Sequence, residues 1–267
     1  MNCGIVISTV IVGGVTMTEP ADGRESRGGL GTVRNAVTLL ELLAEGPAYQ
    51  HLTDLAERSG MSVPTVHRLL RSLVLADLVE QDPRSSRYSL GPELVRLAHR
   101  YLARLPILGA LGPYLAQLRQ LVDATIAVQV LVRSSVVMID RVDGPDSGLF
   151  REPHAVRPAL DTAGGRLLAA RASDEVWAEV LEQADPPDRS EARAQRREWA
   201  TAPWVRRPET ADGIPDQVAV PLVDAHGVTV AALASAVPPG ASEAAVGAIA
   251  AHLSRTAASA VRTLGHA

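Results

Sequence analysis

Apolar residues recur at helical spacing through the first third of the chain. In VRNAVTLLELLAEG, which starts at residue 33, they predict a helix that a Gly-Pro pair ends. A second helix is predicted in LTDLAERSG, with Thr53 as its N-cap and Gly60 as its left-handed last residue. A third begins at the capping residue Ser62 and has one apolar stripe, formed by Val66, Leu69, Leu70 and Leu73.

Two short segments after the third helix predict a hairpin. LVEQD and RYSL read as strands joined by a Pro-Arg-Ser-Ser turn, and residues 92–105 then read as an amphipathic helix. Three short helices followed by a hairpin is the order of a winged helix-turn-helix.

From residue 107 the pattern mixes helices with strands. Strands near both ends and helices between them predict an α+β domain with an antiparallel sheet. The expected helices are 107–122, 162–171, 174–183, 190–200 and 242–264, and the expected strands are 125–132, 136–142, 217–224 and 228–237.

Composition narrows the function classes. A net charge of −4 argues against a protein that simply coats nucleic acid, although a local basic site is compatible with it. All 26 basic residues are Arg, so neither a Walker-type phosphate lysine nor a Schiff-base lysine exists. Cys3 is the only cysteine, which excludes an internal disulfide and a Cys-based zinc site and fits a cytoplasmic protein.

The first 17 residues are apolar and uncharged. They are too few to span a bilayer, and no positive segment precedes them as in a secretion signal. We expect translation to start at Met17 and no membrane association; a real anchor or signal is the alternative.

The side of the third helix opposite its leucines carries candidate DNA contacts. An α-helix fits the major groove, where Arg68 and Arg71 can each donate two hydrogen bonds to guanine. An ordinary solvated face is the alternative, and the ordered set of elements favours DNA. The predicted contacts are Ser62 and Thr65 to phosphate, His67, Arg68 and Arg71 on the helix, and Arg84 and Arg87 at the hairpin tip.

The charge of this segment predicts self-association. Residues 61–90 hold four Arg against Asp77, Glu80 and Asp82, a balance of only +1. Binding by one copy should therefore be weak, which points to a dimer or larger assembly.

The segment from VRNAVTLLELL to RYSLGPEL resembles the N-terminal domain of the IclR family of bacterial transcriptional regulators. HAVRPALDTAGGRLLAA and DQVAVPLVDAHGVTVAALASAV resemble segments of that family's effector domain, so the resemblance covers about residues 30 to 264. It implies operator DNA and a small organic acid effector as partners, in a dimer or tetramer. The implied division is an N-terminal extension, disordered or misannotated (1–31), a winged helix-turn-helix (32–91), a linker helix (92–106) and a GAF-like effector-binding domain (107–267).

Residues that follow HAVRP predict an anion site. Asp161 or Thr162 can cap a helix whose first turn, Ala163-Gly164-Gly165, leaves backbone N–H groups uncovered. A capped helix with glycines for close packing explains the pattern equally well. The resemblance favours ligand binding, and the predicted effector contacts are Met138, Thr162, Ala163, Gly164, Gln217, Ala234 and Ala236.

Several of these positions depart from the family's pattern. Gln217 stands where many members have Cys, Ala234 and Ala236 where serines are frequent, and Arg166 where Lys is frequent. We therefore expect a less polar pocket and a larger or more apolar effector, such as an aromatic acid.

No catalytic motif is present: G-x-S-x-G, H-E-x-x-H and the P-loop are all missing, and the seven His are scattered. We expect no enzyme, catalytic residue, metal site or cofactor. The leading interpretation is a ligand-responsive DNA-binding regulator. The alternatives are a metabolite-binding module or enzyme whose winged helix makes protein contacts, and a structural DNA-binding protein without an effector.

Overall fold

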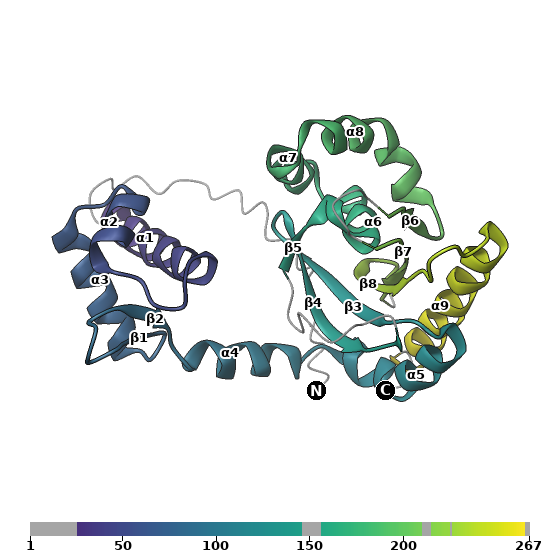
Figure 1. The fold of residues 1–267 in the computed structure, drawn as a ribbon, viewed down its shortest axis with the longest axis horizontal. Coiled ribbons are helices and arrows are strands. Elements are labelled where there is room, and N and C mark those ends of the chain that lie inside the picture. Colours follow the sequence, from purple (N-terminus) through teal and green to yellow (C-terminus); the bar gives the residue numbers. More distant parts are fainter. Residues whose placement is uncertain (1–25, 146–155, 210–214, 225, 265–267) are drawn as a thin grey trace. The chain divides into compact units, whose positions relative to one another are not determined.

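The computed structural model describes residues 26–145, 156–209, 215–224 and 226–264. The chain divides into two compact units, one ending at Arg104 and the other running from Leu105. Figure 1 shows the elements of each unit.

The first unit consists of three helices, a two-stranded hairpin and a fourth helix, in the order that the sequence predicted. Its elements are α1 (Ser26–Glu45), α2 (Leu52–Ser59), α3 (Val63–Leu75), β1 (Val79–Gln81), β2 (Tyr88–Leu90) and α4 (Glu93–Leu102). The helix α1 begins at Ser26, six residues before the expected domain boundary at 32. Backbone hydrogen bonding continues α1 through glycines that disfavour a helix only by about 1 kcal/mol each.

A single core holds the first unit together. The four predicted apolar residues of α3 are all buried in it, and Leu70 is fully inaccessible. They pack with Leu39 and Leu43 of α1 and Leu55 of α2. Gly60 ends α2 in the left-handed conformation, as predicted, whereas the predicted N-cap Thr53 is wrong: His51 holds that position, because the helix already begins at Leu52.

The hairpin is tied to the helices by backbone pairing. Gln50, between α1 and α2, exchanges two backbone hydrogen bonds with Tyr88 of β2, at 2.9 and 2.8 Å. The buried amide of Gln50 also donates to the Leu42 carbonyl at 2.9 Å and accepts from Arg58 at 2.7 Å. The hairpin is therefore fixed beside the start of α2.

The second unit is a six-stranded antiparallel sheet with helices on both faces (Figure 1). The strand order is β5-β4-β3-β8-β7-β6. The strands are β3 (Ile126–Val132), β4 (Ser135–Val142), β5 (Val156–Pro158), β6 (Val205–Arg207), β7 (Gln217–Val223) and β8 (Thr229–Ala236). The helices are α5 (Pro106–Val122), α6 (Ala163–Arg171), α7 (Asp174–Gln183), α8 (Pro186–Thr201) and α9 (Glu243–Leu264).

Each sheet face has its own apolar core. One is formed by α5 and α9 against residues such as Val220 and Leu233. The other is formed by α6, α7 and α8, with Trp177 and Trp199 buried between them. The helix α6 is buried along nearly its whole length, because it lies between the sheet and α8.

Two edge strands, β5 and β6, were not predicted. Each has three residues, too few to show an alternating pattern. The helix α8 also begins earlier than the expected 190, since Pro186 and Pro187 are tolerated in a first helical turn.

The apolar segment 1–17 and the expected start at Met17 lie outside the described residues. Among the residues that are described, no helix combines the length and apolar character needed to cross a bilayer.

The core of the first unit gives a stability prediction. Leu70→Ala should lower the free energy of unfolding by about 2–5 kcal/mol, because it leaves a cavity where a fully buried side chain stood. Leu75, on the same helix, is 81% exposed, so Leu75→Ala should change it by less than about 0.5 kcal/mol. Urea unfolding followed by circular dichroism measures both, and equal losses would contradict this packing.

Candidate DNA-binding surface and effector pocket

The outer face of α3 is an exposed, positively charged surface. His67, Arg68 and Arg71 are all exposed on it. Within the residues that the structure describes, neither guanidinium has a hydrogen-bond or ion-pair partner. The burial of Val66, Leu69, Leu70 and Leu73 on the opposite side explains this orientation. Two unpaired guanidinium groups, one helical turn apart, can therefore reach an external acceptor.

The N-terminus of α3 can receive an anion. Ser62 is the N-cap residue by position, but its hydroxyl makes a 2.8 Å hydrogen bond with the Thr65 hydroxyl instead of capping a backbone N–H. The expected capping bond is therefore replaced by a side-chain pair. Both hydroxyls and the N–H groups of the first turn remain available to a phosphate oxygen.

The hairpin tip presents the two remaining predicted arginines. Arg84 and Arg87 are exposed, and Arg87 Nε donates to His51 Nε2 at 3.0 Å. The tip is shaped by Asp82, whose carboxylate accepts hydrogen bonds from the Ser85 hydroxyl and from the backbone N–H groups of Arg84 and Ser85. These hydrogen bonds lower the pKa of Asp82, and the bond from the Ser85 hydroxyl has the largest effect.

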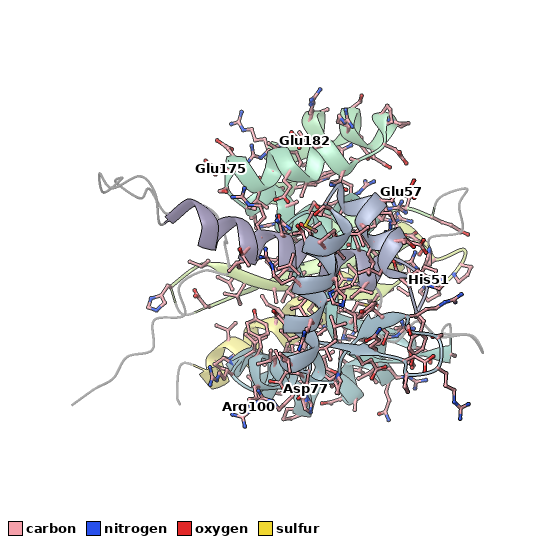
Figure 2. The ribbon with its side chains drawn as sticks, turned by 90° about the vertical axis from the view of Figure 1, so that its left-hand side faces the viewer. His51, Glu57, Asp77, Arg100, Glu175 and Glu182 are labelled. Atoms are coloured by element: carbon pink, nitrogen blue, oxygen red, sulfur yellow. The ribbon has the colours of Figure 1, made fainter. Side chains whose placement is uncertain are left out.

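His51 is a surface residue that the sequence analysis did not include among the DNA contacts (Figure 2). It stands at the N-terminus of α2 and next to Arg87, 36 residues away in the chain. Only the pairing of Gln50 with Tyr88 brings them together, so no local pattern could have indicated it.

The predicted effector residues gather where α6 begins over the sheet. Thr162, not Asp161, caps α6: its hydroxyl accepts the Gly165 N–H at 2.9 Å. Ala163 packs against Ala219 and Ala234 of the sheet. Gln217 pairs with Ala236 at the end of the same two strands. Six of the seven predicted residues thus lie at α6 or on β7 and β8 beneath it.

Gln129 is a central residue of this region that the sequence analysis missed. It lies on β3, between Met138 of β4 and Ala232 of β8. Gln129 therefore connects Met138 to the other predicted residues. Its side chain is 3% exposed and contacts Gly164, where any Cβ would clash with Oε1 of Gln129. A polar residue in an otherwise apolar strand, IAVQVLV, is the signal that could have indicated it.

Two buried arginines flank the beginning of α6. Arg166 Nε donates to the Leu160 carbonyl at 2.8 Å, and its guanidinium lies over the Trp199 ring and 3.2 Å from Glu191. Arg207 on β6 pairs with Gln217 and is 3% exposed; burial lowers its pKa. The sequence predicted a less polar region, because it did not indicate that the side chains of Gln129 on β3 and Arg207 on β6 would lie here.

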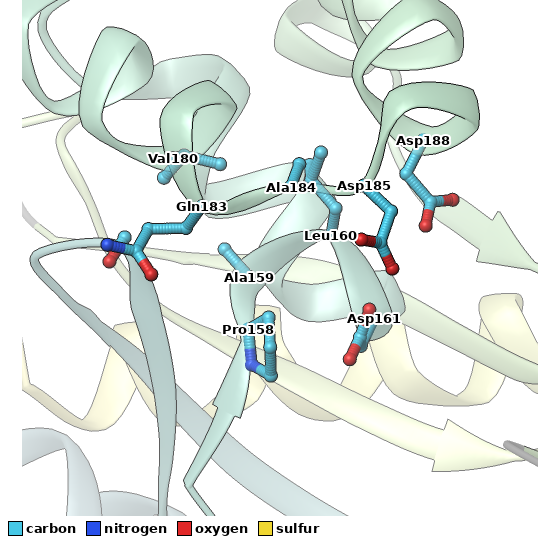
Figure 3. Close-up of a pocket in the computed structure, with 10 residues that line it drawn as sticks. Pro158, Ala159, Leu160, Asp161, Val180, Gln183, Ala184, Asp185 and Asp188 are labelled. Atoms are coloured by element: carbon cyan, nitrogen blue, oxygen red, sulfur yellow. The ribbon is translucent and has the colours of Figure 1, made fainter.

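A small cavity of about 70 Å³ lies beside this region (Figure 3). Leu160, Asp161 and Asp188 are among its lining residues, and none of the predicted effector contacts is. Burial raises the pKa of Asp161, and the charge of Arg207 opposes that rise. Within the described residues, no group of three or more His, Cys, Asp or Glu side chains is placed to hold a metal ion.

Comparison with known proteins identifies the first unit. Residues 32–83 match the IclR helix-turn-helix domain, which covers α2, α3, β1 and most of α1. The glycerol operon regulatory protein of Streptomyces coelicolor is 33% identical over 140 residues, 52% of this chain and 55% of that protein. The chain spans about half the length of the first curated relatives it matches.

Solved structures share the whole fold. An ICLR transcriptional regulator structure from Silicibacter sp. TM1040 has a TM-score of 0.76 at 26% identity, over 88% of this chain and 96% of that one. An IclR homolog from Microbacterium hydrocarbonoxydans, solved with 4-hydroxybenzoate, has a TM-score of 0.67 at 22% identity, over 88% and 100%. The predicted α+β fold with an N-terminal helix-turn-helix is confirmed, and the relatives are named as regulators, not enzymes.

The environment of Asp161 predicts a pH dependence of stability. Its pKa is higher in the folded protein than in the unfolded chain, so stability falls as the pH rises from the unfolded to the folded pKa, and the full cost remains above the folded pKa. Asp161→Asn should therefore melt slightly above the parent protein at pH 7, and this advantage should shrink as the pH falls towards 4. Thermal melts across this range test it, with the exposed Glu198→Gln as control. A melting temperature that drops at pH 7 would show that the Arg207 attraction outweighs burial.

Proposed function

We propose that the chain is an IclR-family transcriptional regulator that binds operator DNA through its winged helix and responds to a small organic acid. One observation supports the DNA-binding part most directly. The leucines of α3 are buried, while Arg68 and Arg71 are exposed and have no partner among the described residues. A helix that reads the major groove needs arginines whose guanidinium groups are free to donate hydrogen bonds to the bases. On a surface without a ligand, such groups usually form ion pairs with Asp or Glu.

In this proposal α3 enters the major groove. Arg68 and Arg71 donate to guanine O6 and N7, and His67 lies beside them. Ser62 and Thr65 bind a backbone phosphate at the helix N-terminus, where the helix dipole assists. Arg84 and Arg87 of the wing contact flanking phosphates, so they add affinity without reading sequence.

We also propose a dimer, which can pair into a tetramer on an operator with two half-sites. None of the ten residues of α4 is buried, although several are large and apolar. Val95 is 72% exposed and Tyr101 46%, and Val33 of α1 is 65% exposed. Apolar surface of this kind is typical of protein–protein contacts. Two recognition helices in one dimer would then reach half-sites about one helical turn, or a multiple of it, apart.

The second unit, residues 107–267, would act as a GAF-like effector domain. The start of α6 at Thr162 and Gly164, together with the neighbouring side chain of Gln129, supports a site for a small acid, and a protein of the same fold was solved with 4-hydroxybenzoate. Effector binding would change the spacing of the recognition helices through the linker helix 92–106. The effector can shift DNA binding only by its different affinities for the two arrangements. Such a regulator acts in the cytoplasm.

The arginines of α3 provide the direct test. DNA selected from a random pool by the parent protein should bind the double variant Arg68→Ala/Arg71→Ala at least about thirtyfold more weakly, because each lost guanine contact costs about 1–3 kcal/mol. Fluorescence anisotropy measures the affinity. Arg193→Ala/Arg197→Ala removes two exposed arginines from α8 and should leave it unchanged. Failure of the parent protein to enrich any DNA would favour a winged helix that makes protein contacts.

The wing gives a separate prediction. Arg84→Ala should weaken binding to all DNA sequences alike, since a phosphate contact carries no sequence information. The substitution should also make the plot of log affinity against log salt concentration less steep, by about one unit of slope for each bound protomer. Affinity titrations at several salt concentrations check both effects. A variant that changes the preferred sequence while keeping the slope would place Arg84 on a base instead.

A further inference from the structure

We propose that Gln129 is a specificity-determining residue that accepts a hydrogen bond from a hydroxyl group of the effector, so that the effector is a hydroxy acid. This inference rests on the proposed function, because it names the chemical class that the effector site selects. It does not depend on the DNA-binding surface.

The carbonyl oxygen of the Gln129 side chain is buried without a partner. The side chain is 3% exposed, and no described residue donates a hydrogen bond to Oε1. Its strand neighbours are apolar, and its cross-strand partners Met138 and Ala232 offer no side-chain donor. An acceptor held away from water without a donor destabilises the protein, so a role outside packing accounts for its presence.

The position of Oε1 connects Gln129 to the effector site. Oε1 lies against Gly164 in the first turn of α6, and the absence of a side chain at Gly164 leaves room for it. The Thr162 hydroxyl caps the N–H of Gly165. The N–H groups of the two residues before it, Ala163 and Gly164, donate no hydrogen bond to any described group. An unpaired acceptor and unpaired donors therefore face the same small region.

This arrangement selects for a molecule with two kinds of polar group. A carboxylate suits the donors at the start of α6, where the helix dipole favours negative charge. A hydroxyl suits Oε1 of Gln129, because it can donate where a carboxylate cannot. Gln217, whose Oε1 also lacks a partner among the described residues, offers a second acceptor at the other end of the site. A hydroxy acid satisfies the donors and at least one acceptor together.

Matched pairs of acids test the proposal. Isothermal titration of the full chain would use 4-hydroxybenzoate against benzoate and lactate against propionate, two pairs that differ by one hydroxyl. In at least one pair the hydroxylated acid should bind about tenfold more tightly, as expected for one hydrogen bond to a buried partner. Gln129→Leu, which keeps the size and removes the acceptor, should abolish this preference while the acid without a hydroxyl still binds.

Two controls separate a lost acceptor from a lost fold. Gln120→Leu changes an exposed glutamine of α5 and should keep the full preference. Gln129→Glu restores an acceptor of the same shape and should retain preference for the hydroxylated acid, although its charge weakens binding of both acids. Circular dichroism and melting temperature establish that each variant is folded.

The outcomes distinguish this inference from the proposed function. If the parent protein binds both members of each pair equally, or if Gln129→Leu keeps the preference, the role of Gln129 is wrong and an acid-responsive regulator stands. If no acid binds while selected DNA does, both the hydroxy acid and the acid effector are wrong, and the DNA-binding proposal alone survives. If Gln129→Leu loses the preference for the hydroxylated acid and Gln120→Leu keeps it, the inference is supported.

Discussion

Burial of one stripe of α3 is the constraint on which the first unit depends. Four apolar side chains of a 13-residue helix enter a core shared with α1 and α2, and Val66 and Leu70 in it are completely inaccessible. A helix cannot bury one stripe without turning the opposite one to solvent. The direction of Arg68 and Arg71 is thus a consequence of leucine packing, and no interaction of the arginines themselves is needed to hold it.

The second unit depends in the same way on small residues. Gly164 and Gly165 leave no side chain between α6 and its neighbours, and a Cβ at Gly165 would clash with the Ala159 backbone. Ala163, Ala219 and Ala234 fill the contact that remains. The close approach brings backbone N–H groups of α6 near Gln129. A site can then form from main-chain donors and one amide, without any lysine in the chain.

Two buried arginines lie beside this close contact between α6 and the sheet. Both Arg166 and Arg207 donate to the carbonyl of Leu160, at 2.8 and 3.4 Å, just before the cap of α6. Arg166 is directed to Trp199 and the acids of α8, so it braces α6 against α8. Arginine suits this role, because its planar group both stacks on Trp199 and forms several hydrogen bonds.

The sequence by itself determined the helices, the long strands and the exposed face of α3. Their signals are local: leucines at helical spacing, a left-handed Gly60 and apolar runs in the long strands. Only the tertiary structure decided which distant residues meet. His51 reaches Arg87 and Gln129 reaches Gly164 through strand pairing and helix docking, and β5 and β6 exist only as edges of a sheet already formed. Such contacts depend on packing between segments far apart in the chain, which leaves no periodic trace in either segment.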